Sequence, residues 1–129
     1  MSSKKYSLVF ESQKKFFESK ATLDISYRIN SIKKLKKQIQ LHENEIIKAL
    51  NKDLGKSLAE SYMSEIGIIY NEINYVLKKI KKWSKKRKVS SSLFNFLSTD
   101  YILPCPYGVT LNISPCNYPF QLPISPIIG

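Results

Sequence analysis

The side chains that could perform chemistry in this sequence are few. It contains one histidine, His42, and two cysteines, Cys105 and Cys116. His42 has charged neighbours in a stretch with helical periodicity, so we expect a surface residue rather than a general base. Two cysteines alone do not make a zinc site, and without a secretory context we expect no disulfide. No P-loop, GxGxxG, HExxH or GxSxG pattern is present, so residue spacing alone defines no catalytic or metal centre.

The composition is that of a globular protein. The chain has 129 residues, of which 43% are hydrophobic and 24% are charged, enough for one domain with a core. Its net charge of +11 raises nucleic acid or an anionic membrane as a partner. Lys, Ile, Asn and Ser are all heavily used, so we favour a general compositional bias and do not expect nucleic-acid binding. No apolar run has the length of a signal peptide or a transmembrane segment, which predicts a cytoplasmic protein.

Helices are expected before the proline-rich end of the chain. The first covers residues 3–19 and has a lysine-rich polar face. The second begins after Asp24, whose carboxylate can cap free backbone N–H groups, and ends at Gly55, which tolerates a left-handed conformation. Apolar residues recur along it at helical spacing, on one face: Ile25, Ile29, Ile32, Leu35, Ile39, Ile46, Leu50 and Leu54.

A third helix is expected over residues 59–86, after a short turn at residues 55–57. Gly67 lies inside it, which favours close packing at that point. Its apolar face carries Tyr62, Ile66, Ile69, Ile73, Val76 or Leu77, Ile80 and Trp83. We expect the second and third helices to form an antiparallel hairpin with facing apolar stripes and with Trp83 in the core. The basic run at residues 78–88 closes the third helix, where the helix dipole favours positive charge, and is weak evidence for nucleic acid.

The character of the sequence changes after Asp100, and all six prolines follow that residue. Residues 90–100 read as a connector and residues 101–106 as an extended edge segment. Residues 109–113 have the β-rich composition of a strand. A loop then leads to an apolar element that begins at Phe120.

A distinctive block occupies this last part of the chain. It reads Pro106-Tyr-Gly-Val-Thr-Leu-Asn-Ile-Ser-Pro-Cys-Asn-Tyr-Pro-Phe120, and Pro126-Ile-Ile-Gly129 follows it. The block resembles one of the aldehyde dehydrogenase family, and its tyrosine resembles the class 3 and fatty-aldehyde members. Three upstream segments also resemble the N-terminal helices of that family: Arg28-Ile-x-x-Ile-x-x-Leu, Ala49-Leu-x-x-Asp53-Leu-x-Lys56, and the helix with Glu65 and Tyr75-Val-Leu. The resemblance covers nearly the whole chain.

The resemblance implies the N-terminal portion of an α/β fold. This portion is mostly α, with a long helical hairpin followed by two short strands and the start of a helix. Residues 1–89 would form the N-terminal helical region, and residues 90–107 a connector and extended oligomerisation-type segment. Residues 108–129 would begin a truncated NAD(P)-binding domain. The complete enzyme would be a homodimer.

The resemblance also implies roles for individual residues. Such enzymes oxidise an aldehyde to a carboxylic acid with NAD or NADP, and Asn117 matches the asparagine that donates its amide to the oxyanion. Tyr118 would face the substrate. The cofactor would be lined by Ile113, Ser114, Pro115 and Cys116. By residue type alone, Asn117 would be an ordinary loop asparagine in a turn or a helix cap.

Two departures from the family pattern qualify these roles. Cys116 stands where the family usually has tryptophan, and it is not the family nucleophile. The nucleophilic cysteine, the general-base glutamate and the phosphate-binding glycine motif of the family fall outside these 129 residues, so we expect the chain alone to be inactive. Alternatives are a basic helical interaction module, which would pair with a separately encoded remainder of a split enzyme or an anionic surface, and a non-functional gene remnant.

Overall fold

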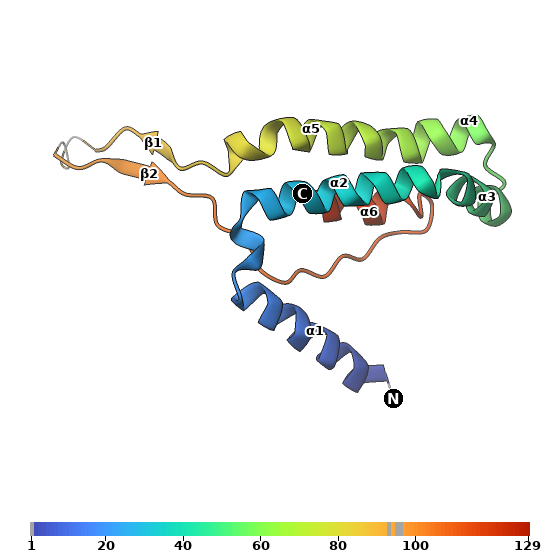
Figure 1. Ribbon diagram of the computed structural model, residues 1–129, viewed down its shortest axis with the longest axis horizontal. Coiled ribbons are helices and arrows are strands. Elements are labelled where there is room, and N and C mark those ends of the chain that lie inside the picture. The colour runs from blue at the N-terminus through green and yellow to red at the C-terminus, as the bar shows by residue number, and fades with distance from the viewer. Residues whose placement is uncertain (1, 93, 95–96) are drawn as a thin grey trace.

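The structure is a computed structural model that describes residues 2–92, 94 and 97–129. Its elements are α1 (Ser2–Glu18), η1 (Ala21–Leu23), α2 (Ile25–Leu41), α3 (Glu43–Leu54), α4 (Leu58–Ser61), η2 (Tyr62–Ile66), α5 (Gly67–Trp83), β1 (Arg87–Val89), β2 (Asp100–Ile102) and α6 (Gln121–Ile128). In Figure 1, α5 runs alongside α2, and α6 packs against α5. Helix α1 diverges from this layer, and the β1–β2 hairpin projects from one end of it.

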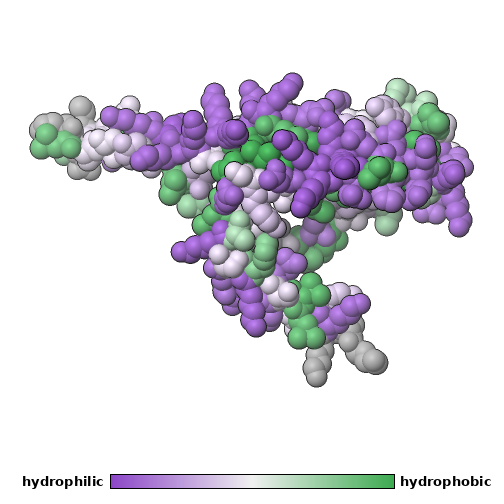
Figure 2. All heavy atoms as spheres, in the orientation of Figure 1, coloured by the Kyte–Doolittle hydropathy of each residue, from purple (hydrophilic) through white to green (hydrophobic). Residues whose placement is uncertain are grey.

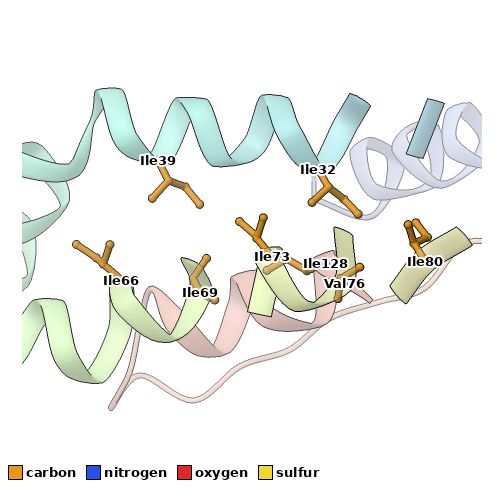
Figure 3. Close-up of a cluster of buried hydrophobic side chains, with 8 residues drawn as sticks. All are labelled: Ile32, Ile39, Ile66, Ile69, Ile73, Val76, Ile80 and Ile128. Atoms are coloured by element: carbon orange, nitrogen blue, oxygen red, sulfur yellow. The ribbon is translucent and has the colours of Figure 1, made fainter. Parts of the chain in front are cut away.

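The predicted antiparallel helical hairpin is confirmed. Its core is an aliphatic cluster from three segments, in which α2 faces the run from η2 to α5 and α6 closes one side (Figure 3). The buried members are Ile32, Ile39, Ile66, Ile69, Ile73, Val76, Ile80 and Ile128. The removal of this apolar surface from water drives the helices together.

The predicted ends of the second helical segment are confirmed. The Asp24 carboxylate accepts a hydrogen bond from the Ser26 N–H at 2.9 Å and so caps the start of α2. Gly55 ends α3 with φ 67°, in the left-handed region that favours glycine. The segment is not one helix, however. His42 (φ −106°, ψ 13°) leaves the helical region and divides it into α2 and α3, so the prediction that His42 lies in mid-helix was wrong, although it is an exposed residue as expected.

The third helical segment runs from Leu58 to Trp83 and contains one turn of π-helix, η2, that the sequence did not predict. Trp83 was expected in the core, but it lies at the C-terminal end of α5 with 48% of its surface exposed. Its ring contacts the Tyr75 ring edge-on, with 5.6 Å between centroids. The aliphatic cluster reaches along α5 only as far as Ile80, so Trp83, at the end of the helix, packs against an aromatic residue of its own helix instead of the core.

The prediction of a strand over residues 109–113 is wrong. The structure has strands at β1 and β2, which pair antiparallel with Arg87 opposite Ile102 and Val89 opposite Asp100. Residues 109–113 have irregular backbone, and Leu111 and Ile113 are 85% and 83% exposed. A strand needs a neighbour to supply its hydrogen-bond ladder, and within the described residues no strand lies beside this segment. The connector expected over residues 90–100 includes residues 93, 95 and 96, which lie outside the described residues.

Apolar side chains are also exposed on the arm formed by α1. The predicted first helix is confirmed as Ser2–Glu18, but Tyr6, Leu8 and Phe10 each expose half of their surface or more. Figure 2 shows hydrophobic atoms on this arm, whereas hydrophilic side chains cover much of the visible face of the α2–α5 layer. Among the described residues, no helix is both long and apolar enough to cross a membrane.

The contribution of the aliphatic core can be measured at Ile73, which is fully buried. Ile73→Ala is expected to lower the free energy of unfolding by about 2–5 kcal/mol, because it removes buried methyl groups and leaves a cavity. Urea unfolding followed by circular dichroism measures this change. Ile68→Ala is the matched control, since Ile68 lies on the same helix with 41% of its surface exposed. Equal losses for the two variants would contradict the assignment of Ile73 to the core.

Candidate functional site

The six residues with predicted roles lie together in the irregular segment that precedes α6. Ile113, Pro115 and Cys116 are exposed, and Ser114 is half-buried. The Ser114 hydroxyl donates a hydrogen bond to the Asn112 side chain at 3.3 Å, and the Asn112 amide donates to the Pro123 carbonyl at 2.8 Å. These bonds tie the segment to the first turn of α6, so the predicted cofactor-lining residues form an open surface rather than an enclosed pocket.

Asn117 and Tyr118 follow directly and meet the helical hairpin. The backbone carbonyl of Asn117 accepts a hydrogen bond from the Lys56 ammonium group at 3.2 Å. The same ammonium group lies over the Tyr118 ring, 4.2 Å from its centroid, which is a cation–π contact. The Asn117 side chain makes no hydrogen bond within the part of the chain that the structure describes. Its amide is therefore available to a ligand.

A buried ion pair holds this loop. Lys56 Nζ and Glu65 Oε1 are 2.5 Å apart, and the two side chains are 8% and 0% exposed. The second carboxylate oxygen, Oε2, accepts the backbone N–H groups of Phe120 at 2.8 Å and Gln121 at 3.1 Å. Free N–H groups at a helix start carry partial positive charge and favour an anion. Glu65 therefore neutralises Lys56 and caps the N-terminus of α6 at the same time.

Local structure on both sides fixes the positions of Lys56 and Glu65. The Asn51 side-chain amide donates to the Lys56 carbonyl at 3.0 Å, and the Ser57 hydroxyl caps α4 by accepting the Glu60 N–H at 3.1 Å. Glu65 lies in the π-helical turn η2, which gives the helix an extra residue at that point. Lys56 therefore sits in a tight turn between two helices, and Glu65 sits on the buried face of the second.

Gly67 permits this π-turn. A Cβ atom on Gly67 would lie 2.9 Å from the Tyr62 carbonyl oxygen, closer than real Cβ contacts allow. The close packing expected at this glycine is thus confirmed, and the contact is with the backbone of the π-turn itself. A side chain at residue 67 would force the turn that carries Glu65 to shift.

A second polar cluster lies between α3 and the run from η2 to α5 and contains none of the predicted site residues. The Tyr70 hydroxyl donates to the Glu43 carboxylate at 2.6 Å, beside the Tyr62 ring. Burial raises the pKa of the Tyr70 phenol well above its usual value, and the hydrogen bond to Glu43 raises it further. The cluster lines a shallow groove between the two helical segments, together with Lys36 and Asn74, which are hydrogen-bonded to each other at 2.7 Å. Tyr70 and Glu43, and likewise Lys36 and Asn74, thus satisfy one another by hydrogen bonds.

Sequence reasoning missed Lys56 and Glu65 as parts of the site. Both were noticed only as positions that resemble the family. One signal could have found Glu65: it lies four residues before Ile69 and eight before Ile73, on the apolar stripe of the third helical segment. A carboxylate on such a face must find a partner when it is buried. The nearest basic residue outside that helical segment is in the turn at residues 55–57, which contains Lys56.

Comparison with known proteins shows the family. The model of the aldehyde dehydrogenase family matches residues 1–129, and the chain belongs to that family. The 4,4'-diaponeurosporen-aldehyde dehydrogenase of Staphylococcus aureus is 44% identical over 120 residues, 93% of this chain and 26% of that protein. Aldehyde dehydrogenase family 3 member H1 of Arabidopsis thaliana is 40% identical over 113 residues, 88% of this chain and 23% of that protein.

A solved structure shows the same arrangement of elements. The substrate-bound state of Staphylococcus aureus AldH superposes with a TM-score of 0.90 at 44% identity, over 92% of this chain and 26% of that one. The mostly helical fold with two short strands thus matches part of an aldehyde dehydrogenase. The chain spans about a quarter of the length of the relatives that it matches.

The role of Gly67 can be tested by the sign of a mutational effect. In an ordinary helix, Gly→Ala stabilises by up to about 1 kcal/mol. Gly67→Ala is expected instead to lower the free energy of unfolding by about 1–3 kcal/mol, since the new methyl group clashes with the π-turn. Urea unfolding measures this change, with the exposed Asn71→Ala on the same helix as the control. A more stable Gly67→Ala variant would show that the π-turn does not depend on this glycine.

The raised pKa of Tyr70 predicts a loss of stability in alkali. The phenol stays protonated in the folded state while it ionises in the unfolded state from about pH 10. Its contribution to the free energy of unfolding is therefore complete below about pH 10 and declines as the pH rises further. Tyr70→Phe is expected to reduce the slope of stability against pH in that range, measured by urea unfolding at successive pH values. Tyr107→Phe, at a fully exposed tyrosine, should keep the original slope.

Proposed function

We propose that this chain is the N-terminal part of an enzyme that oxidises an aldehyde to a carboxylic acid with NAD or NADP. The family match over residues 1–129 and the names of the relatives support this proposal, and they favour it over a stand-alone basic interaction module. Because the chain spans about a quarter of those relatives, the nucleophilic cysteine and the general base belong to the remaining part of the enzyme.

The single observation that supports a catalytic role most directly is the environment of Asn117. The loop backbone is anchored through the Asn117 carbonyl, whereas the side-chain amide makes no hydrogen bond to any of the described residues. Attack of a thiolate on an aldehyde carbon turns the carbonyl oxygen into an anion. A fixed, neutral N–H donor stabilises that charge without adding a competing charge to the site. In the proposed reaction Asn117 is that donor.

The neighbouring residues have the properties that a cofactor and substrate surface needs. The bound nicotinamide cofactor would accept the hydride that leaves the substrate carbon. Ile113, Ser114, Pro115 and Cys116 would form one wall of its site, and their exposure in an open surface fits one wall and not a closed pocket. Tyr118 would face the substrate, with its ring oriented by the Lys56 ammonium group. Cys116 would line this wall and would not act as the nucleophile.

We also propose a division of the chain into three parts. Residues 1–89 form the N-terminal helical region, residues 90–107 a connector and oligomerisation segment, and residues 108–129 the start of the NAD(P)-binding domain. Strand β1 lies at the end of the first part and β2 lies in the second part, and the hairpin that they form projects from the helical layer (Figure 1). Such a projecting strand pair leaves an unpaired edge to which a strand of a second subunit can add, and this supports the proposal of a homodimer.

The proposal is tested first by the nucleotide sequence beyond codon 129 and by a turnover assay. We expect a continuous or adjacent open frame that encodes a glycine-rich phosphate-binding motif, a glutamate and a cysteine. The polypeptide that combines both parts is expected to reduce NAD or NADP in the presence of an aliphatic aldehyde, measured by absorbance. A polypeptide of these 129 residues alone is the control and is expected to show no turnover. Turnover by the control would contradict the proposed location of the nucleophile.

The oxyanion role predicts a specific kinetic defect. In the combined enzyme, Asn117→Ala is expected to lower kcat by about 100-fold to 1,000-fold with little change in KM, because the donor acts on charge that forms in the transition state. Steady-state kinetics measures both constants. Asn30→Ala, at an exposed asparagine on α2, is the matched control and should leave both unchanged. An Asn117→Ala enzyme with unaltered kcat would remove Asn117 from the mechanism.

A further inference from the structure

The Lys56–Glu65 ion pair is costly to bury. Glu65 is fully buried and Lys56 is 7% exposed, next to a core that is otherwise aliphatic. Removing two charges from water carries a large penalty, and apolar side chains of similar size at such positions are often neutral or stabilising. Stability of the helical hairpin therefore gives little reason for a charged pair at these two positions.

The contacts that remain after the pair has formed all go to one loop. Glu65 Oε2 accepts the N–H groups of Phe120 and Gln121, and Lys56 Nζ donates to the carbonyl of Asn117. The pair thus holds three backbone atoms within five consecutive residues. The two charges are also placed to match their partners, because the Glu65 carboxylate accepts from N–H groups and the Lys56 ammonium group donates to a carbonyl.

Resting on the proposed function, we infer that Lys56 and Glu65 are positioning residues for the oxyanion donor Asn117. Beyond the pair itself, their contacts with this loop are to its backbone and to the Tyr118 ring. They fix the backbone at the Asn117 carbonyl and at the Phe120 and Gln121 N–H groups that follow it, and so they define the position of the Asn117 Cα atom that carries the amide side chain. The aldehyde oxygen is then met by a donor that does not have to reorganise during the reaction.

The anchor is rigid because both of its ends belong to the helical hairpin. Lys56 is held through its own carbonyl by Asn51, and Glu65 lies between the fully buried Ser61 and Ile66 in the run from α4 to η2. In the segment that the pair holds, Asn117, Tyr118 and Pro119 are exposed, whereas Phe120 and Gln121 are half-buried. Without the pair, this segment would keep the packing of Phe120 and Ile128 against the core and the hydrogen bonds from α6 to the Tyr118 and Phe120 carbonyls, but the Asn117 carbonyl would lose its partner.

A purely structural role and a positioning role predict different behaviour for an apolar pair. Lys56→Met or Glu65→Gln alone leaves a buried group without its partner, and both roles predict lower stability. Lys56→Met combined with Glu65→Leu removes both charges. If the pair only stabilises the fold, the double variant should recover stability and kcat together. If the pair positions Asn117, the double variant should recover stability while kcat stays low.

The experiment uses the combined enzyme, with kinetics and thermal unfolding measured for the wild type, both single variants and the double variant. We expect kcat to fall by about tenfold to a hundredfold in all three, since a misplaced group is lost mainly from the transition state. KM for the aldehyde is expected to change less than about twofold in Glu65→Gln, which keeps the contact of Lys56 with the Tyr118 ring. Glu45→Gln is the matched control and should change neither constant. It replaces an exposed carboxylate on α3 whose Oε2 lies 2.9 Å from Nδ1 of His42, the residue before that helix.

Amide hydrogen exchange gives a readout that does not depend on turnover. In the variants, exchange at Phe120 and Gln121 is expected to accelerate at least about tenfold, while amides of the α5 core such as Ile73 remain protected in the double variant. Unchanged exchange at Phe120 and Gln121, or recovery of kcat in the double variant, would overturn the inference. If the wild-type enzyme turns over no aldehyde, the proposed function fails, and the exchange data alone then decide whether the pair fixes the loop.

Discussion

Two opposite charges without access to water impose the main constraint on this structure. Lys56 and Glu65 must stay within hydrogen-bond distance of each other, and each must use its remaining hydrogen-bonding capacity on a nearby group. Those groups are the backbone of residues 117–121, far away in the sequence. The requirement that buried charges be satisfied therefore determines how the last part of the chain docks on the helical hairpin.

The aliphatic core supports that arrangement from the other side. Facing stripes of α2 and the run from η2 to α5 exclude water from the region next to Glu65, and Ile128 brings α6 into the same cluster (Figure 3). Hydrophobic burial acts without direction, so it can hold α6 against the hairpin but cannot define the path of the loop that precedes it. The hydrogen bonds of the ion pair supply that direction. The site thus depends on both kinds of interaction at adjacent places on one surface.

Local signals in the sequence predicted most, but not all, of the helical part. The spacing of isoleucines predicted the hairpin, Asp24 predicted the start of α2, and Gly55 predicted the end of α3, because each of these features acts within a few residues. The π-turn at η2 and the break at His42 were missed, since the same periodicity fits a continuous helix almost as well.

The errors in the last part of the chain have a different origin. The β-rich composition of residues 109–113 expresses a preference for strand, but composition cannot supply the neighbouring strand that the preference needs. The roles of Asn117 and its neighbours came from family resemblance and remain predictions. Lys56 and Glu65 are hard to recognise in the sequence because their importance comes from contacts across 55 to 61 positions, from Glu65 to Phe120 and Gln121 and from Lys56 to Asn117. The spacing of apolar residues shows which face of a helix is buried. It does not show which backbone groups, distant in the sequence, will form hydrogen bonds with a charged side chain on that face.

The docking of residues 117–121 on the hairpin also bears on how such proteins can be recombined. The hydrogen bonds of Lys56 and Glu65 cross the proposed boundary between the helical region and the cofactor domain. A chimera that takes residues 1–89 from one relative and the remainder from another inherits the two halves of this contact from different parents. Residues 56–121 should therefore come from the same parent, although their secondary structure divides them into separate segments. A crossover point that keeps these hydrogen bonds lies before Lys56 or after Gln121.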